Sequence, residues 1–77
     1  MAKRKSLAIA LEHLDKGDWE AAHKIVQSDS SLAACWAHGI VHVLEGDLDN
    51  ARYWYKRAER AFSEDTTQEI AALKKSL

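Results

Sequence analysis

Apolar side chains recur at every third or fourth position along nearly the whole chain, which is the spacing of amphipathic α-helices. The spacing predicts five helices, over about residues 3–16, 19–28, 32–45, 48–62 and 66–76. The chain has no proline and only three glycines, so its composition favours long helical segments. The apolar faces predicted to form the core are, in chain order, Leu7, Ala10, Leu11 and Leu14; Trp19, Ala22, Ile25 and Val26; Leu32, Trp36, Gly39, Ile40 and Val43; Leu48, Ala51, Tyr55, Ala58 and Phe62; and Ile70, Leu73 and Leu77.

A short turn pattern occurs twice in the chain. The pattern Gly-Asp-apolar-x-x-Ala spans residues 17–22 and 46–51, so the two copies lie 29 positions apart. Glycine tolerates the left-handed backbone that ends a helix, and the aspartate after it can cap the next helix. The sequence therefore predicts an all-α fold in a single domain, 1–77, with two antiparallel helical hairpins, about 3–28 and 32–62, and a last helix, about 66–76.

Two further signals are local. Gly39 lies inside the third predicted helix, where a glycine costs about 1 kcal/mol relative to alanine. Such a cost is usually tolerated where another helix crosses closely, so we expect the fourth helix to pack there, with Ala51 or Ala58 as the small counterpart. Thr66 and Glu69 have the spacing of a capping box at the start of the last helix.

The hairpins resemble the tetratricopeptide-repeat family, whose unit is a pair of helices. The offset of 29 residues is shorter than the family's repeat of about 34, which indicates a shortened second helix. The last helix is similar to the capping helices that cover the exposed apolar face of solenoid proteins. The matching positions are Gly39, Gly46, Asp47, Leu48, Ala51, Tyr55 and Ala58 in the second hairpin, and Ala10, Gly17, Asp18, Trp19, Ala22 and Val26 in the first.

This resemblance implies peptide binding in a groove lined by the first helix of each hairpin. The corresponding positions here are Trp36, Ile40 and Val43, which are apolar, whereas the carboxylate clamps of the family use Lys, Arg and Asn. We therefore expect the groove to be covered by the chain's own last helix or by a second copy. Residues 34–58 also resemble a set of small bacterial proteins of unassigned function, which implies nothing about activity.

Charge and composition exclude several classes of partner. The formal net charge of −1 argues against a nucleic acid held by bulk electrostatics, and the basic run Lys3-Arg4-Lys5 is expected to be solvated. No stretch reaches the ~18 apolar residues of a membrane span. The single cysteine, Cys35, cannot form an intrachain disulfide and is expected to be a small buried hydrophobe. Its presence fits a reducing cytoplasm, which is the predicted location.

The third predicted helix carries a polar stripe beside its apolar face. Cys35, His38, His42 and Glu45 follow one another at spacings of three, four and three, which places them along one edge of the helix. Two histidines four residues apart can share a metal ion, and Glu45 is a candidate third ligand. His23, on the preceding helix, is a further candidate. Such a set favours Zn(II), with Ni(II), Cu(II) and non-haem iron as alternatives.

A structural role is the competing interpretation of these histidines. His13 and His42 each lie four residues before the glycine of their turn, so the same residue type has the same place in both hairpins. This repetition favours packing or hydrogen bonding within the hairpin. Cys35 and His38 do not make a catalytic pair, because no third group orients the imidazole and no loop offers an oxyanion site. No enzymatic activity and no cofactor are predicted.

The leading functional prediction is a small non-enzymatic interaction module that binds a protein partner or itself, for example as a homodimer. Outward-facing aromatic and aliphatic side chains support it, since tyrosine is enriched at interface hot spots. The alternative is a metal-binding protein that uses the stripe of the third helix together with His23. The candidate interaction residues are Tyr53, Trp36, Ile40 and Ile9.

Overall fold

The computed structural model describes the backbone of residues 2–77 and the side chains from Lys5 onward. Over that part of the chain it contains five helices and no strand, which confirms the all-α prediction. The side chains of Lys3 and Arg4, expected to be solvated, lie outside the described residues. The helices are α1 (Ala2–Asp15), α2 (Trp19–Val26), α3 (Leu32–Glu45), α4 (Leu48–Arg57) and α5 (Thr66–Ser76).

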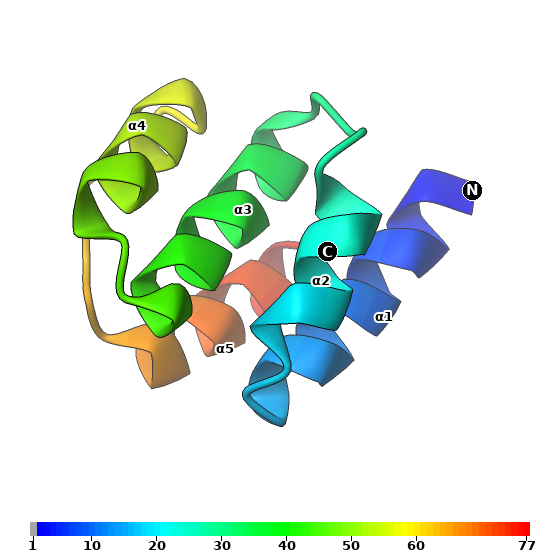
Figure 1. Ribbon diagram of the computed structural model, residues 1–77. Helices are drawn as coiled ribbons and strands as arrows, with labels where there is room; N and C mark the ends of the chain where they lie inside the picture. Colours follow the sequence, from blue (N-terminus) through cyan, green and yellow to red (C-terminus); the bar gives the residue numbers. More distant parts are fainter. Residues whose placement is uncertain (1) are drawn as a thin grey trace.

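The helices form two adjacent hairpins closed by a fifth helix (Figure 1). Helix α1 packs against α2, α2 packs against α3, and α3 packs against α4, so α3 lies between α2 and α4. Helix α5 lies below α3 in the view of Figure 1 and packs against both α3 and α1. Of the helices described, none is both long and apolar enough to cross a lipid bilayer.

The two hairpin turns have the same hydrogen-bond pattern. In the first, the Asp18 amide donates to the His13 carbonyl at 2.9 Å, across a left-handed Gly17 with φ of 76°. In the second, the Asp47 amide donates to the His42 carbonyl at 2.9 Å, across Gly46 with φ of 93°. These are the bonds of a Schellman motif, and each aspartate then caps the following helix. The repeated turn predicted from the sequence is confirmed.

Helix α4 ends earlier than predicted. The periodicity extended the fourth helix to Phe62, but the helix ends at Arg57. Glu59 adopts a left-handed backbone with φ of 60°, and the Arg60 amide donates to the Tyr55 carbonyl at 3.0 Å. This is the same helix-ending pattern as in the two glycine turns, formed here by a glutamate. Because no glycine stands at this position, the end of the helix could not be predicted from the sequence.

Glu69 ties α5 to both helices of the second hairpin. One of its carboxylate oxygens accepts a hydrogen bond from Trp36 Nε1 at 3.1 Å and another from the Tyr55 hydroxyl at 2.8 Å. Burial, followed by this bond to Glu69, raises the pKa of Tyr55 above its ordinary range. The capping box predicted for Thr66 and Glu69 is wrong, because Asp65 caps α5 by accepting from the Gln68 amide.

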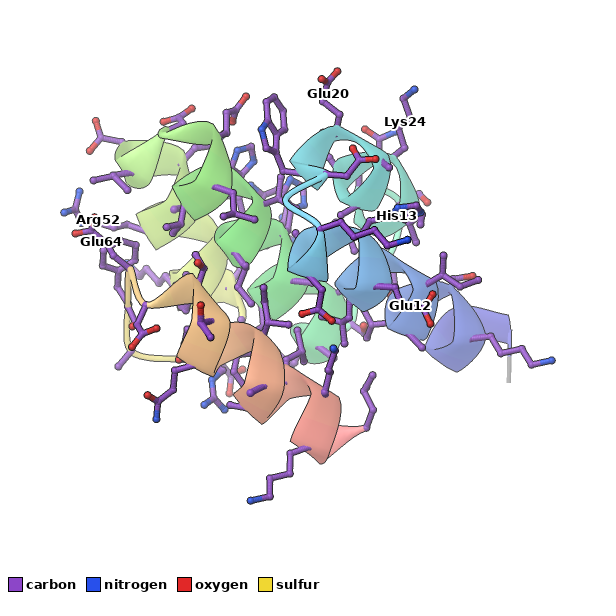
Figure 2. All side chains as sticks on the ribbon, turned by 90° about the horizontal axis from the view of Figure 1, so that it is seen from below. Glu12, His13, Glu20, Lys24, Arg52 and Glu64 are labelled. Atoms are coloured by element: carbon purple, nitrogen blue, oxygen red, sulfur yellow. The ribbon has the colours of Figure 1, made fainter. Side chains whose placement is uncertain are left out.

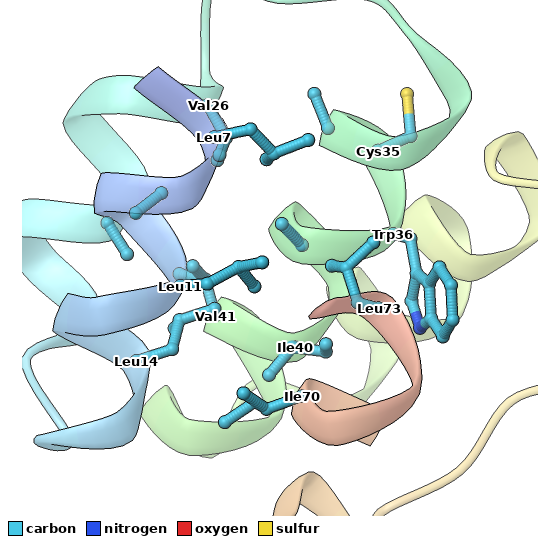
Figure 3. Close-up of a cluster of buried hydrophobic side chains, with 14 of the residues drawn as sticks. Leu7, Leu11, Leu14, Val26, Cys35, Trp36, Ile40, Val41, Ile70 and Leu73 are labelled. Atoms are coloured by element: carbon cyan, nitrogen blue, oxygen red, sulfur yellow. The ribbon is translucent and has the colours of Figure 1, made fainter. Parts of the chain in front are cut away.

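The core lies between α1, α3 and α5 (Figure 3). Ile40 is fully buried and Trp36 is only 4% exposed, since α5 covers the face of α3 on which they lie. The prediction that these two residues belong to an open interaction surface is therefore wrong, and the chain's own last helix covers the groove. The residues that meet in this layer are Leu7, Leu11, Leu14, Ile40, Val41, Ile70 and Leu73.

Gly39 lies where α4 packs closely against α3. A Cβ at this position would lie 2.6 and 2.8 Å from two ring carbons of Tyr55, and 3.4 Å from the carbonyl oxygen of Ala51. The close crossing of the fourth helix is thus confirmed. Ala51, one of the two predicted counterparts, does lie against the glycine through its backbone, but the closest group is the aromatic ring of Tyr55, which was not predicted.

Gly39→Ala should lower the free energy of unfolding by up to about 2 kcal/mol, because overpacking a filled core costs about 1–3 kcal/mol and the better helix propensity of alanine offsets about 1 kcal/mol of it. The Tyr55 ring cannot easily give way, because it is buried and its hydroxyl is bound to Glu69. Urea denaturation at pH 7 measures the change. A stability about 1 kcal/mol above that of the wild type, which is the full gain in helix propensity, would show that the added methyl group meets no steric resistance from Tyr55.

Glu59→Gly should raise the free energy of unfolding by about 1 kcal/mol. A left-handed backbone costs a non-glycine residue about 1–2 kcal/mol, and Glu59 is exposed, so little side-chain contact is lost. The same urea experiment checks this gain. Glu64→Gly, in the nearby loop, is the control for adding a glycine where no positive φ is recorded.

Candidate metal centre

Three histidines from two helices converge in the structure. His23 comes from α2, and His38 and His42 come from α3. One ring nitrogen of each lies within 4.8 Å of the corresponding nitrogens of the other two. The ring centroids lie 4.7 Å apart for His23 and His38, 5.6 Å for His23 and His42, and 4.9 Å for His38 and His42.

Helix packing brings these side chains together. His38 and His42 are four residues apart and therefore share one face of α3. Helix α2 packs against α3, which places His23 against the same two rings. His38 and His42 are 5% and 6% exposed, whereas His23 is half-buried. The cluster therefore lies at the junction of the two hairpins, with His23 on its accessible side.

Both nitrogens of His42 have a partner. Nδ1 lies 2.7 Å from a carboxylate oxygen of Glu45, and Nε2 lies 3.3 Å from the side-chain amide nitrogen of Asn50. A carboxylate accepts hydrogen bonds, so Nδ1 carries the proton and Nε2 presents its lone pair. Glu45 therefore fixes both the tautomer and the orientation of this ring.

His38 is held by stacking. Its ring lies parallel to the indole of Trp54, with 3.8 Å between centroids and an angle of 9° between planes, and it also stacks on His42. Burial, then the neighbouring His42, His23 and Arg57, lowers the pKa of His38 from 6.5 to about 4. His38 is therefore neutral at physiological pH, and its ring keeps a free lone pair.

Of the four metal ligands predicted from the sequence, three lie together and Glu45 does not join them. His23, His38 and His42 come together, but Glu45 is grouped with His42 and Asp47 on the Nδ1 side of the ring. Within the described chain, no carboxylate or thiol joins the three imidazoles within that spacing. Glu45 thus orients a candidate ligand and does not complete the trio.

Asn50 and Trp54 are the two site residues that sequence reasoning missed. A usable signal was present, because the second hairpin is antiparallel about Gly46. Asn50 lies four residues after that glycine, as His42 lies four before it, and Trp54 lies eight after it, as His38 lies eight before. Positions at equal distances from a tight turn face one another, and these two pairs are in contact.

The competing structural interpretation agrees with the side chains of the second hairpin, where the His42 ring contacts the Asn50 amide and the His38 ring stacks on Trp54. The backbone of these turns has a hydrogen bond of its own. The carbonyls of His13 and His42 both accept the amide of the aspartate in their turn. Any residue supplies that carbonyl, so this bond does not require a histidine at either position. The side chain of His13 is 34% exposed and its Nδ1 lies 3.9 Å from an Asp18 oxygen. Figure 2 shows His13 on the opposite side of the molecule from Arg52 of α4.

The other candidate residues are placed as follows. Tyr53 and Ile9 are exposed, at 54% and 49%, and their role in an interface stays a prediction. Cys35 is buried, with its sulfur 3.9 Å from the Ser30 carbonyl, as expected for a small hydrophobe. The chain matches no protein-family model, no curated protein and no solved structure, so the tetratricopeptide resemblance also stays a prediction.

The stability of the protein should fall as the pH is lowered from about 6.5 toward 4. Over this range the unfolded chain protonates its histidine at position 38, while the folded chain, with a pKa of about 4, does not. The loss is on the order of 2–3 kcal/mol and is measured by urea denaturation at pH 7, 6 and 5. His38→Gln should flatten the dependence and His13→Gln should keep it. Equal slopes in all three proteins would contradict the assignment.

Proposed function

We propose that this protein binds a transition-metal ion through His23, His38 and His42. The observation that supports the proposal is the convergence of three imidazole nitrogens within 4.8 Å at the junction of two hairpins. When three imidazoles bind an ion tetrahedrally with metal–nitrogen bonds of about 2.1 Å, their ligating nitrogens lie roughly 3.4 Å from one another. Side-chain rotations that move the nitrogens by about an ångström therefore bring them to binding distance. The half-buried His23 has the most freedom to make this movement.

The donor set decides the class of metal. Imidazole nitrogen suits Zn(II), Cu(II), Ni(II) and Co(II), whereas Mg(II) and Ca(II) require oxygen ligands that this trio does not contain. The ion takes the Nε2 lone pair of His42, so the amide of Asn50 must turn away from it. Glu45 keeps its hydrogen bond to Nδ1, which is the carboxylate–histidine–metal arrangement that strengthens such ligands.

An ion here would also link the two hairpins. Of the three ligands, His23 belongs to the first hairpin and the other two to the second. Binding free energy available only to the folded chain adds to its stability. For a chain of 77 residues with one small core, this contribution is large relative to the expected stability.

Protein interaction is the second candidate function. The surface that remains for it is smaller than predicted, because Trp36 and Ile40 are buried. The observation that favours it is Tyr53, which is 54% exposed and has the guanidinium of Arg57 5.8 Å above its ring. Both candidates are non-enzymatic.

Zn(II) should bind at one equivalent and raise the melting temperature by about 10–20 °C at 100 times the dissociation constant. Isothermal titration calorimetry of the metal-free protein gives the stoichiometry, and thermal unfolding with and without EDTA gives the shift. His23→Ala should weaken binding at least tenfold, since even loss of a residue that only orients a ligand costs about 10–100-fold.

His13→Ala is the matched control, because His13 is also a half-buried helical histidine but lies outside the cluster. It should bind Zn(II) as the wild type does. Far-UV circular dichroism confirms that both variants keep their helix content. Equal weakening in the two variants, or no saturation of the wild type near one equivalent, would contradict the proposal.

A further inference from the structure

The cluster supplies three ligands and no fourth. His23, His38 and His42 form the group, and among the described residues no Cys, Asp, Glu or further His joins all three. Structural zinc sites are usually closed by four protein ligands, whereas sites with three keep a position for water or another small ligand. The number of protein donors therefore distinguishes a structural site from an open one.

The nearest carboxylates are already engaged elsewhere. Glu45 accepts a hydrogen bond from Nδ1 of His42 at 2.7 Å. The Asp47 side chain caps α4 by accepting a hydrogen bond from the backbone amide of Asn50 at 3.2 Å. Both lie with His42 in a separate group that does not include His23 or His38. Moving either one onto the ion would break a hydrogen bond that orients a ligand or caps a helix.

The surroundings of the cluster favour a small anion in the open position. The three ligands are uncharged when bound through a lone pair, so a divalent ion keeps its full double charge. The guanidinium of Arg57 lies 4.7 Å over the Trp54 ring, and the same indole stacks 3.8 Å from His38. Through this stack Arg57 places a positive charge near the cluster. His23 is the half-buried member of the trio and leaves the cluster accessible to solvent.

We infer that an ion bound by these three histidines keeps one exchangeable coordination position that takes water or a small monodentate anion. The inference rests on the proposed metal binding and adds the class of ligand that the bound ion accepts. No ligand exchange of this kind is expected at an ion closed by four protein side chains.

The test uses the full chain loaded with one equivalent of Co(II), whose visible absorption reports the ligands around the ion, and azide as the anion. Addition of azide should change the Co(II) bands and saturate with one azide per ion. A Co(II) spectrum typical of bound metal that azide leaves unchanged would overturn the inference and leave metal binding intact. A chain that does not bind Co(II) at all would overturn both.

Arg57→Gln and Lys56→Gln form a matched pair, because both remove one exposed positive charge from α4. Arg57→Gln should weaken azide binding about two- to fivefold without weakening Co(II) binding, and Lys56→Gln should change azide binding less. Equal effects of the two variants would contradict the part of the inference that assigns Arg57 to the anion.

Discussion

The burial of α3 on all sides is the constraint on which the rest of the structure depends. From Ala34 to His42, nine consecutive residues are buried, because α2, α4 and α5 each cover part of the helix and α1 contacts it as well. A helix covered all round has no solvent face on which to place charged side chains. It therefore combines small and apolar residues with two buried histidines, and has Gly39 where the Tyr55 ring leaves no room for a Cβ.

The chemistry of the candidate site follows from this burial. His38 remains neutral because removing its ring from water disfavours the protonated form, and stacking on Trp54 replaces some of the lost solvent contact. The polar groups that His42 needs come from the end of α3 and the start of α4, where Glu45 and Asn50 reach it from the surface. Stacking for His38 and two hydrogen-bond partners for His42 thus make a buried imidazole pair compatible with an apolar core.

The sequence predicted what depends on local spacing and missed what depends on contacts between distant segments. The two glycine turns, the bounds of α3 and the shared face of His38 and His42 follow from helix geometry and capping. The end of α4 at Arg57 did not, since the left-handed Glu59 that follows it has no sequence signature. The role of Glu69 depends on where α5 folds back, 33 residues after Trp36, and no periodicity carries that information.

Comparison of the two repeated hairpins distinguishes the residues that form the turn from those that surround the histidine cluster. Both hairpins have the same turn, and a histidine carbonyl accepts the same amide in each. The partners of the His42 imidazole, Glu45 and Asn50, belong to the second hairpin. The His13 imidazole of the first hairpin is half-buried beside its own turn. At the positions where the second hairpin has His38, Glu45, Asn50 and Trp54, the first has Ile9, Lys16, Ala21 and Ile25. Because the first hairpin forms without these four residues, the repeated turn by itself does not require them.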